Sequence, residues 1–158
     1  MLKLTVMMTM GLLSTAALAQ DAGVSVSVGQ RISIIGGCHD CHTVGYSESN
    51  GKIDPAAALK GNPVGFAGPW GVNYAANLRL VAAKMSEDQW VKHLQTFEVG
   101  PPMPWFNVRA LTENEMRSLY QYVVSLGAPG DPAPADLKPG EKPKTPYMVF
   151  APPTMPAG

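Results

Sequence analysis

The chain has 158 residues, and its 12 basic and 12 acidic side chains balance. Nucleic-acid binding needs clustered positive charge, so this balance argues against it. Two cysteines are too few for a disulfide-rich scaffold. With 16 Gly and 15 Pro, the composition favours loops over a large sheet or bundle, and a domain of this size then needs a further source of cohesion.

Residues 1–19 have the features of a signal peptide: Lys3, an apolar stretch over 4–13, and an A-x-A sequence that ends at Ala19. A retained anchor is the alternative, but the apolar stretch is shorter than the roughly 20 residues that a spanning helix needs. We therefore expect cleavage after Ala19 and a periplasmic destination. No later segment is long or apolar enough to cross a bilayer.

The next elements are short. Residues 22–29 indicate a loose lead-in, and 30–37 indicate a short helix, although their isoleucines also suit a strand. Loop is expected over most of 43–85, apart from a short helix over 54–61 that has Asp at its N-cap and Gly after its end. The stretch 62–77 places aromatic residues among Gly and Pro, which predicts that it wraps something flat.

Two capping boxes mark clearer helices. Ser86 and Gln89 begin a helix over 86–97, and Thr112 and Glu115 begin one that ends before Gly127. Apolar residues recur at helical spacing in both. No apolar–polar alternation is long enough for a real sheet, so the sequence predicts a mainly α fold of short helices and long loops.

The composition changes at residue 128. Nine of the 31 residues over 128–158 are prolines, which predicts a flexible or polyproline C-terminal extension after a domain over 20–127. The segment 147–150 (YMVF) is too apolar for a solvated tail, so we expect part of the extension to dock on the domain.

The most informative motif is the pentapeptide over 38–42, with the pattern C-x-x-C-H. This is the attachment sequence for c-type haem. Thiols of Cys38 and Cys41 are spaced to reach the two vinyl groups on one side of a porphyrin, and His42 follows as the proximal iron ligand. A covalently held haem would give a small, loop-rich domain a large apolar centre.

Three other interpretations compete with haem. The cysteines could form a disulfide, or they could be a thioredoxin-like redox pair, although no βαβ context is apparent. A zinc site would need His39 or His93 beside Cys38, Cys41 and His42 to complete four ligands. We expect His39 to be solvent-exposed or to bond the backbone.

A sixth ligand is expected opposite His42. Met103 is the best candidate because Pro102 and Pro104 flank it in a stiff loop, and a thioether ligand raises the reduction potential. His93 is the rival, although a surface or half-buried structural histidine is the commoner outcome on such a helix. Met116 lies on a helix stripe and is expected to pack in the core.

The order of a short helix, CxxCH, loops, a Pro-flanked Met and a final amphipathic helix resembles a class I cytochrome c. The segments IGGCHDCHT, GPWGVNYAANL and PPMPW are closer still to the haem modules of membrane-associated dehydrogenase cytochrome subunits of bacteria, over residues 29–127. In that fold the helix before the motif crosses the final helix, and Gly29 or Gly36 would allow close approach to the Tyr120 face.

The resemblance implies one covalent haem c. It would be attached to Cys38 and Cys41, with iron ligated by His42 and Met103. It also places four further residues beside the haem, where they would hydrogen-bond or pair with propionates: Trp70, Asn73, Asn77 and Arg79. Loop packing and turn chemistry are the alternative for the first three, and a solvent-facing side chain is the alternative for the arginine.

The leading function is a monohaem electron carrier rather than an enzyme. It would pass single electrons from a dehydrogenase or respiratory complex to an acceptor cytochrome or oxidase. The alternatives are a haem with a labile sixth site that binds or reduces peroxide or NO, and a structural or zinc module without haem. Residues 22–127 carry eight basic and eight acidic residues, so docking would be short-lived and largely apolar. The tail could tether a partner, in which case deleting 131–158 would lower turnover with that partner and leave the absorption spectrum of the haem unchanged.

Overall fold

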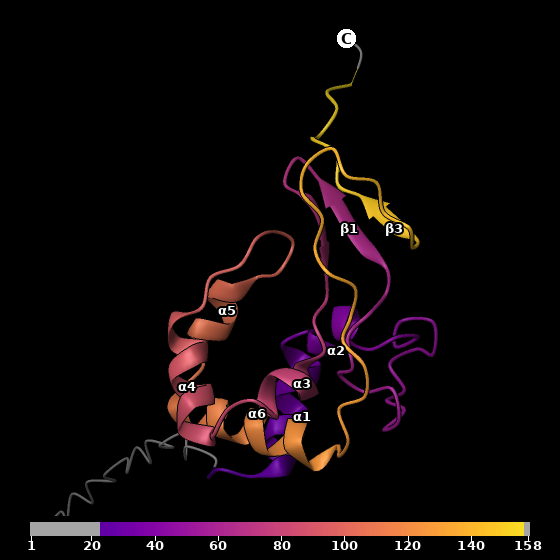
Figure 1. Cartoon of the computed structure of the whole chain (residues 1–158). Coiled ribbons are helices and arrows are strands. Elements are labelled where there is room, and N and C mark those ends of the chain that lie inside the picture. The colour runs from indigo at the N-terminus through magenta and orange to yellow at the C-terminus, as the bar shows by residue number, and fades with distance from the viewer. Residues whose placement is uncertain (1–22, 157–158) are drawn as a thin grey trace, which may run out of the picture.

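The computed structural model describes residues 23–156, and this part of the chain contains six helices and a small three-stranded sheet. In Figure 1, α1, α3 and α6 lie together at the base, α4 and α5 form one side, and the sheet and the tail rise on the other. The prediction of short helices and long loops is confirmed, whereas the prediction that no sheet would form is wrong. The elements are α1 (Val26–Ile35), α2 (Cys38–His42), β1 (Gly65–Gly68), β2 (Gly71–Tyr74), α3 (Leu78–Ala82), α4 (Glu87–Thr96), α5 (Trp105–Arg109), α6 (Glu113–Ser125) and β3 (Tyr147–Val149).

Helix α1 begins earlier than the sequence predicted. The side chain of Ser25 accepts a hydrogen bond from the backbone N–H of Val28, so Ser25 is the N-cap and the expected lead-in is already helical from Val26. The backbone N–H of Ser25 also donates to the hydroxyl of Ser118 on α6. Tertiary packing against α6 therefore outweighs the strand preference of the β-branched residues in α1.

The crossing of α1 and α6 is as close as backbones allow. A Cβ at Gly29 would lie 1.9 Å from the carbonyl oxygen of Ser118 and 2.8 Å from Cβ of Tyr122. The expectation of a glycine at this crossing is thus met by Gly29, but the facing residues are Ser118 and Tyr122 rather than Tyr120. Only a residue without a side chain fits there.

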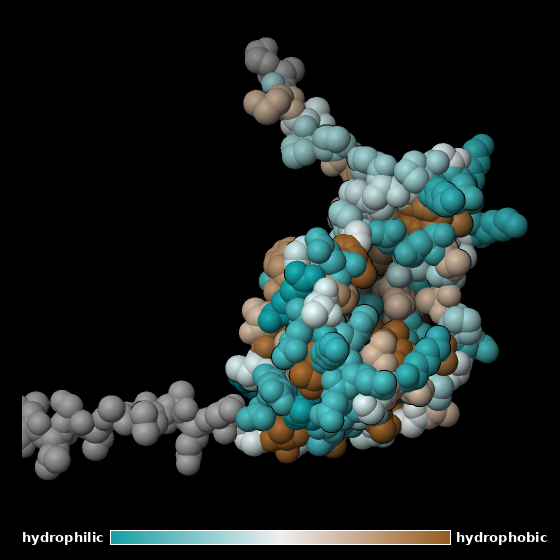
Figure 2. Space-filling view, turned by 60° about the vertical axis from the view of Figure 1, so that its left-hand side comes forward, coloured by the Kyte–Doolittle hydropathy of each residue, from teal (hydrophilic) through white to brown (hydrophobic). Residues whose placement is uncertain are grey.

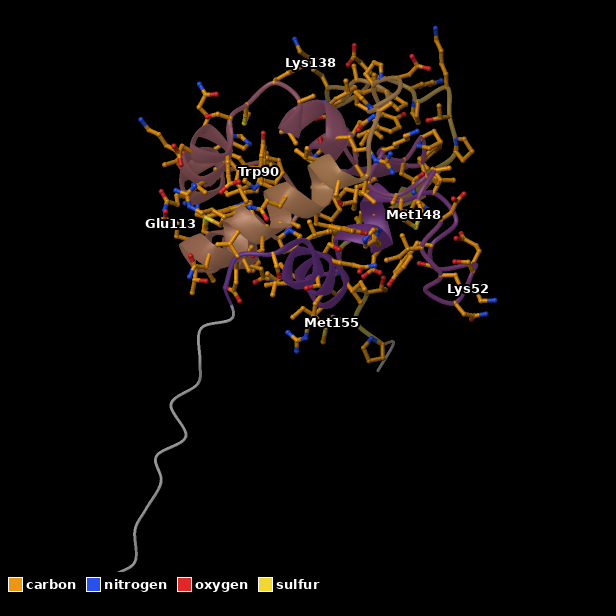
Figure 3. All side chains as sticks on the ribbon, turned by 90° about the horizontal axis from the view of Figure 1, so that it is seen from below. Lys52, Trp90, Glu113, Lys138, Met148 and Met155 are labelled. Atoms are coloured by element: carbon orange, nitrogen blue, oxygen red, sulfur yellow. The ribbon has the colours of Figure 1, made fainter. Side chains whose placement is uncertain are left out.

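Helices α4 and α6 supply the core. Both predicted capping boxes are formed, by Ser86 with Gln89 and by Thr112 with Glu115. The indole of Trp90 is buried between the two helices and donates to the carbonyl of Met116, 3.1 Å away. Figure 3 shows Trp90 inside the helical part of the molecule, whereas the labelled lysines lie at the periphery. Met116 is 1% exposed, as expected for a core methionine.

The helix predicted over 54–61 is instead a series of turns. Leu59 has a φ of +56°, in the left-handed region that stops a helix. The carbonyls that would continue the helix have other donors, because Ala58 accepts from the Arg79 guanidinium and Leu59 accepts from the backbone N–H of Leu78. These donors lie about 20 residues away in the sequence, so no local pattern reveals them.

Strands β1 and β2 form an antiparallel hairpin that lies between two segments of the tail. On one edge β3 pairs with β1 in parallel, and on the other Leu137 and Val72 exchange two backbone hydrogen bonds. Gly71 permits the second contact, since a Cβ there would lie 2.1 Å from the Leu137 carbonyl oxygen. The expectation that 147–150 docks on the domain is confirmed, although its side chains stay largely exposed, and Figure 2 shows apolar atoms at the surface of this end.

The predicted signal peptide over 1–19 lies outside the described residues. Between residues 23 and 156, no helix combines the length and the apolarity needed to span a membrane.

Replacing Gly29 by Ala tests the crossing. The added methyl group would force the α6 backbone at Ser118 away, so we expect the free energy of unfolding to fall by about 1–3 kcal/mol. The gain in helix propensity, about 1 kcal/mol, is too small to reverse this loss. The measurement is chemical denaturation of the purified protein. A control is Gly23→Ala, where the methyl group meets nothing within 4 Å and the change should stay within about 0.5 kcal/mol. Equal stability of the two variants would contradict the close crossing.

Candidate functional site

The C-x-x-C-H pentapeptide forms the short helix α2, which follows α1 after a sharp turn. Gly37, with a φ of +70°, is its N-cap and allows the change of direction. Cys38 and Cys41 are both half-buried free thiols. Because residues three apart in a helix share one face, the two thiols are presented on the same side of α2.

Neither thiol has the character of a redox-active cysteine. Burial raises the pKa of Cys38 to about 11, and it raises the pKa of Cys41 as well. Catalytic C-x-x-C pairs instead depend on a lowered pKa that makes the thiolate available. The thiols are free, and among residues 23–156 no group of three or more His, Cys, Asp and Glu side chains could hold a metal ion. The raised pKa values of both thiols argue against the thioredoxin-like interpretation.

His42 is buried, and a backbone carbonyl holds its ring. It is 7% exposed, and its Nδ1 lies 2.7 Å from the carbonyl oxygen of Ala76. A carbonyl only accepts, so Nδ1 carries the proton and Nε2 keeps its lone pair. Burial lowers the pKa of His42, while the hydrogen bond to Ala76 opposes that shift, and the neutral imidazole results. Two thiols on one helical face and an imidazole with a free Nε2 fit a covalently attached haem.

The expectation that the side chain of His39 is exposed or bonds the backbone is wrong. It is fully buried (0% exposed), and its ring hydrogen-bonds the hydroxyls of Ser33 and Thr43, with a longer contact of 3.4 Å between Nε2 and the Tyr122 hydroxyl. The Ser33 hydroxyl donates to the Gln30 carbonyl, so it accepts from Nε2 of His39. The Thr43 hydroxyl accepts from the Leu59 N–H and can donate to Nδ1. This chain is complete only when His39 is neutral, and burial lowers its pKa accordingly.

The His39 network was invisible to sequence reasoning for a physical reason. A histidine in a variable position of the motif is expected at the surface, and its partners, the hydroxyls of Ser33, Thr43 and Tyr122, belong to no motif of their own. The ring also lies 5.2 Å from Tyr46 and 6.1 Å from Tyr122 on α6. His39 therefore ties α2 to α1 and α6, and so helps to fix where His42 lies.

Met103 lies in the loop between α4 and α5 and is half-buried. Arg109 closes the base of this loop: Nε donates to the Phe97 carbonyl (2.9 Å) and Nη2 to the Thr96 carbonyl (2.7 Å). The same guanidinium lies 4.4 Å from the centre of the Trp105 ring, a cation–π contact. The side chain of Arg109, on α5, is thus bonded to the end of α4, and it joins the two ends of the loop that carries Met103.

His93, the rival ligand, is half-buried on α4 with its ring 5.3 Å from that of Phe97. A half-buried histidine that packs on a neighbouring ring was the expected alternative to a ligand at this position. Asn73 on β2 reaches the tip of the Met103 loop, where its amide donates to the carbonyl of Pro101.

Trp70 and Asn77 both have protein partners. The Trp70 indole donates to the carbonyl of Phe66, and its ring lies 6.0 Å from Phe150 of the tail. Asn77 caps α3 by accepting from the Leu80 N–H, and its amide donates to the carbonyls of Pro129 and Asp131 in the tail. These contacts are the loop packing and turn chemistry that the sequence left open. A role for either residue at a propionate stays a prediction.

Arg79 is 4% exposed, so the alternative of a solvent-facing side chain is wrong. Its guanidinium donates to the carbonyls of Pro55, Ala58 and Leu126, with a longer contact of 3.4 Å to Ala128. Burial lowers its pKa. Every hydrogen bond of Arg79 in the described chain goes to a carbonyl, and pairing with a propionate stays a prediction.

The comparison with known protein families gives one match that covers most of the described chain. The model of the cytochrome c family matches residues 26–127, which include the C-x-x-C-H helix, the Met103 loop and α6. The chain therefore belongs to the cytochrome c family, whose members carry covalently bound haem and act in electron transfer. No curated protein and no solved structure matches it. The division between a domain over 20–127 and a tail from 128 stays a prediction.

Replacing His39 by Ala tests the network behind α2. The change empties a buried position and removes the partner of the Ser33, Thr43 and Tyr122 hydroxyls, so the free energy of unfolding should fall by about 2–4 kcal/mol. Urea denaturation measures it. His93→Ala, the same change at a half-buried position, is the matched control and should cost clearly less. A loss at His39 no greater than at His93 would contradict the role of the network.

Proposed function

We propose that this chain is a class I, monohaem c-type cytochrome of the periplasm that carries single electrons between redox proteins. The observation that carries the proposal is the state of His42. Its Nδ1–H is taken by the Ala76 carbonyl, so Nε2 is free to ligate from within the C-x-x-C-H helix. The proline-flanked Met103 would provide the second iron ligand, a soft thioether. Export rests on the signal-peptide pattern of residues 1–19.

A bound haem supplies a one-electron couple whose potential depends on its axial ligands. The chain's own residues act on that couple by holding the ligands still. Ala76 fixes the imidazole ring of His42, and His39 fixes the helix that carries it. Arg109 closes the base of the Met103 loop. A site in which neither ligand moves suits electron transfer, because little of the protein has to rearrange when the charge changes.

The proposed partners are redox proteins: a dehydrogenase or respiratory complex as donor, and a cytochrome or oxidase as acceptor. The likeness to dehydrogenase cytochrome subunits supports this choice of donor, and the chain could itself be such a subunit. Exposed apolar side chains near the Met103 loop, Val99 and Phe106, supply a docking surface that does not depend on charge. Docking through such contacts is short-lived, as is common for small redox interfaces.

Covalent haem is tested directly. Protein made with the cytochrome c maturation machinery should give one haem per chain in a pyridine haemochrome assay, and the haem should stay on the denatured chain. A variant with both Cys38→Ala and Cys41→Ala should lose it, because no thiol remains to form a thioether. A colourless wild-type protein would contradict the proposal.

Replacing Met103 by Ala separates the electron carrier from a haem with a labile sixth site. If Met103 is the sixth ligand, the variant should bind CO in the ferrous state and lose the near-infrared sulfur–iron band of the ferric state. The wild type should resist CO. Met85→Ala is the matched control, because Met85 is also half-buried but lies just before α4. Ready CO binding by the wild type would favour the alternative, a protein that binds or reduces peroxide or NO.

A further inference from the structure

The tip of the loop that carries Met103 lies against β2. The amide Nδ2 of Asn73 donates to the carbonyl of Pro101, two residues before Met103. Among the described residues this is the only hydrogen bond between segment 98–104 and the hairpin. Gly100, the preceding residue, also lies near this amide, since a Cβ built there would be 3.0 Å from Nδ2 of Asn73. The amide of Asn73 therefore fits against two neighbouring residues of the loop.

The hairpin that carries Asn73 is itself held by the tail. Tyr74, the neighbour of Asn73, makes two contacts with it: its backbone N–H donates to Oδ1 of Asp136 (2.7 Å), and its hydroxyl lies 2.9 Å from the hydroxyl of Thr145. The outer edges of both strands are also hydrogen-bonded to tail segments, at Leu137 and along β3. Figure 1 shows the tail running beside the hairpin, and the α4–α5 loop reaching towards it from the other side.

We propose that Asn73 is a positioning residue for Met103, and that the tail braces the hairpin from which Asn73 acts. The proposal rests on the function proposed above, in which Met103 is the sixth ligand. Arg109 already fixes the base of the loop, so displacement of Met103 requires the tip to swing away from β2. The Asn73–Pro101 hydrogen bond must break for that movement, and it therefore sets how readily another ligand replaces the thioether.

This role differs from both expectations drawn from the sequence. The resemblance implies that Asn73 borders a haem propionate, which stays a prediction, and the role proposed here rests instead on its hydrogen bond to a carbonyl of the Met103 loop. The tail was expected to act as a tether whose loss leaves the spectrum unchanged. A tail that braces the hairpin instead belongs to the apparatus of the sixth ligand, and loosening it changes the spectroscopic behaviour of the haem.

The test uses Asn73→Asp in the holoprotein, with imidazole as the probe. Aspartate has the same size but no N–H donor, and its oxygens repel the Pro101 carbonyl. Stopped-flow absorption of the ferric protein should show imidazole replacing Met103 roughly threefold to tenfold faster than in the wild type, as expected for the loss of one hydrogen bond. Asn73→Ala, which adds no charge, should accelerate exchange in the same direction.

The matched control is Asn107→Asp on α5. Asn107 is exposed, lies four residues after Met103, and its side chain makes no hydrogen bond within the described chain. The same change of charge there should leave the exchange rate as in the wild type. In a Met103→Ala background, imidazole binding should no longer respond to Asn73→Asp, because no thioether remains to be held.

The tail is tested by Asp136→Ala, which removes the acceptor of the Tyr74 N–H, against Asp131→Ala, whose carboxylate accepts no hydrogen bond in the described chain. We expect a smaller acceleration for the first and none for the second. An exchange rate that ignores Asn73→Asp, or an acceleration that persists without Met103, overturns the role of Asn73. In both cases the proposed function still stands if the wild-type protein has covalent haem and a sulfur–iron band. A wild-type protein without them overturns the function and this role together.

Discussion

The hydrogen bond between His42 and the carbonyl of Ala76 is the interaction on which the site depends. A neutral imidazole has one nitrogen with a proton and one with a lone pair, and a carbonyl, which can only accept, requires the proton on the nitrogen that it faces. Ala76 lies in the segment between β2 and α3, so the position of that segment sets the orientation of the ring. Asn77, the next residue, caps α3 and binds the tail, which means that the acceptor of His42 is fixed from both sides.

A second constraint comes from proline. Each proline removes a backbone N–H but keeps its carbonyl, so a chain with 15 prolines has more acceptors than backbone donors. Side-chain donors make up part of the difference. Arg79 and Arg109 donate to loop carbonyls, and Asn73 and Asn77 donate to carbonyls of proline residues. The domain thus holds its loops with guanidinium and amide groups where a larger protein would use regular secondary structure.

The sequence predicts interactions between residues that are close together in the chain and misses those between residues that are far apart in it. The two capping boxes and the C-x-x-C-H motif depend on residues within a few positions of one another, and local patterns describe them. Arg79 reaches carbonyls 21 to 49 residues away, and β3 pairs with a strand about 80 residues earlier. No spacing rule reports such contacts. The strands were missed because they are short and because the partner of β1 lies in a segment with the composition of a proline-rich tail.

His39 shows how an incorrect local prediction still carries information. Its fully buried ring, bonded to a hydroxyl on α1 and a hydroxyl after α2, leaves the motif helix little freedom to turn. These contacts hold both thiols and His42 of α2 against α1 and α6.

For this chain, the two candidate functions, an electron carrier and a ligand-binding haem protein, differ in how easily the Met103 loop leaves its position. A carrier needs the thioether to stay in place through many cycles, whereas a protein that binds small ligands needs it to leave. In the role proposed for Met103, the contacts of Arg109 at the base, Asn73 at the tip and the tail behind the hairpin would each raise the cost of that movement. They come from three separate parts of the chain, so the loop opens only if contacts distant in sequence fail. A site assembled in this way favours a fixed ligand, and the choice between the functions thereby becomes a question about hydrogen bonds outside the haem pocket.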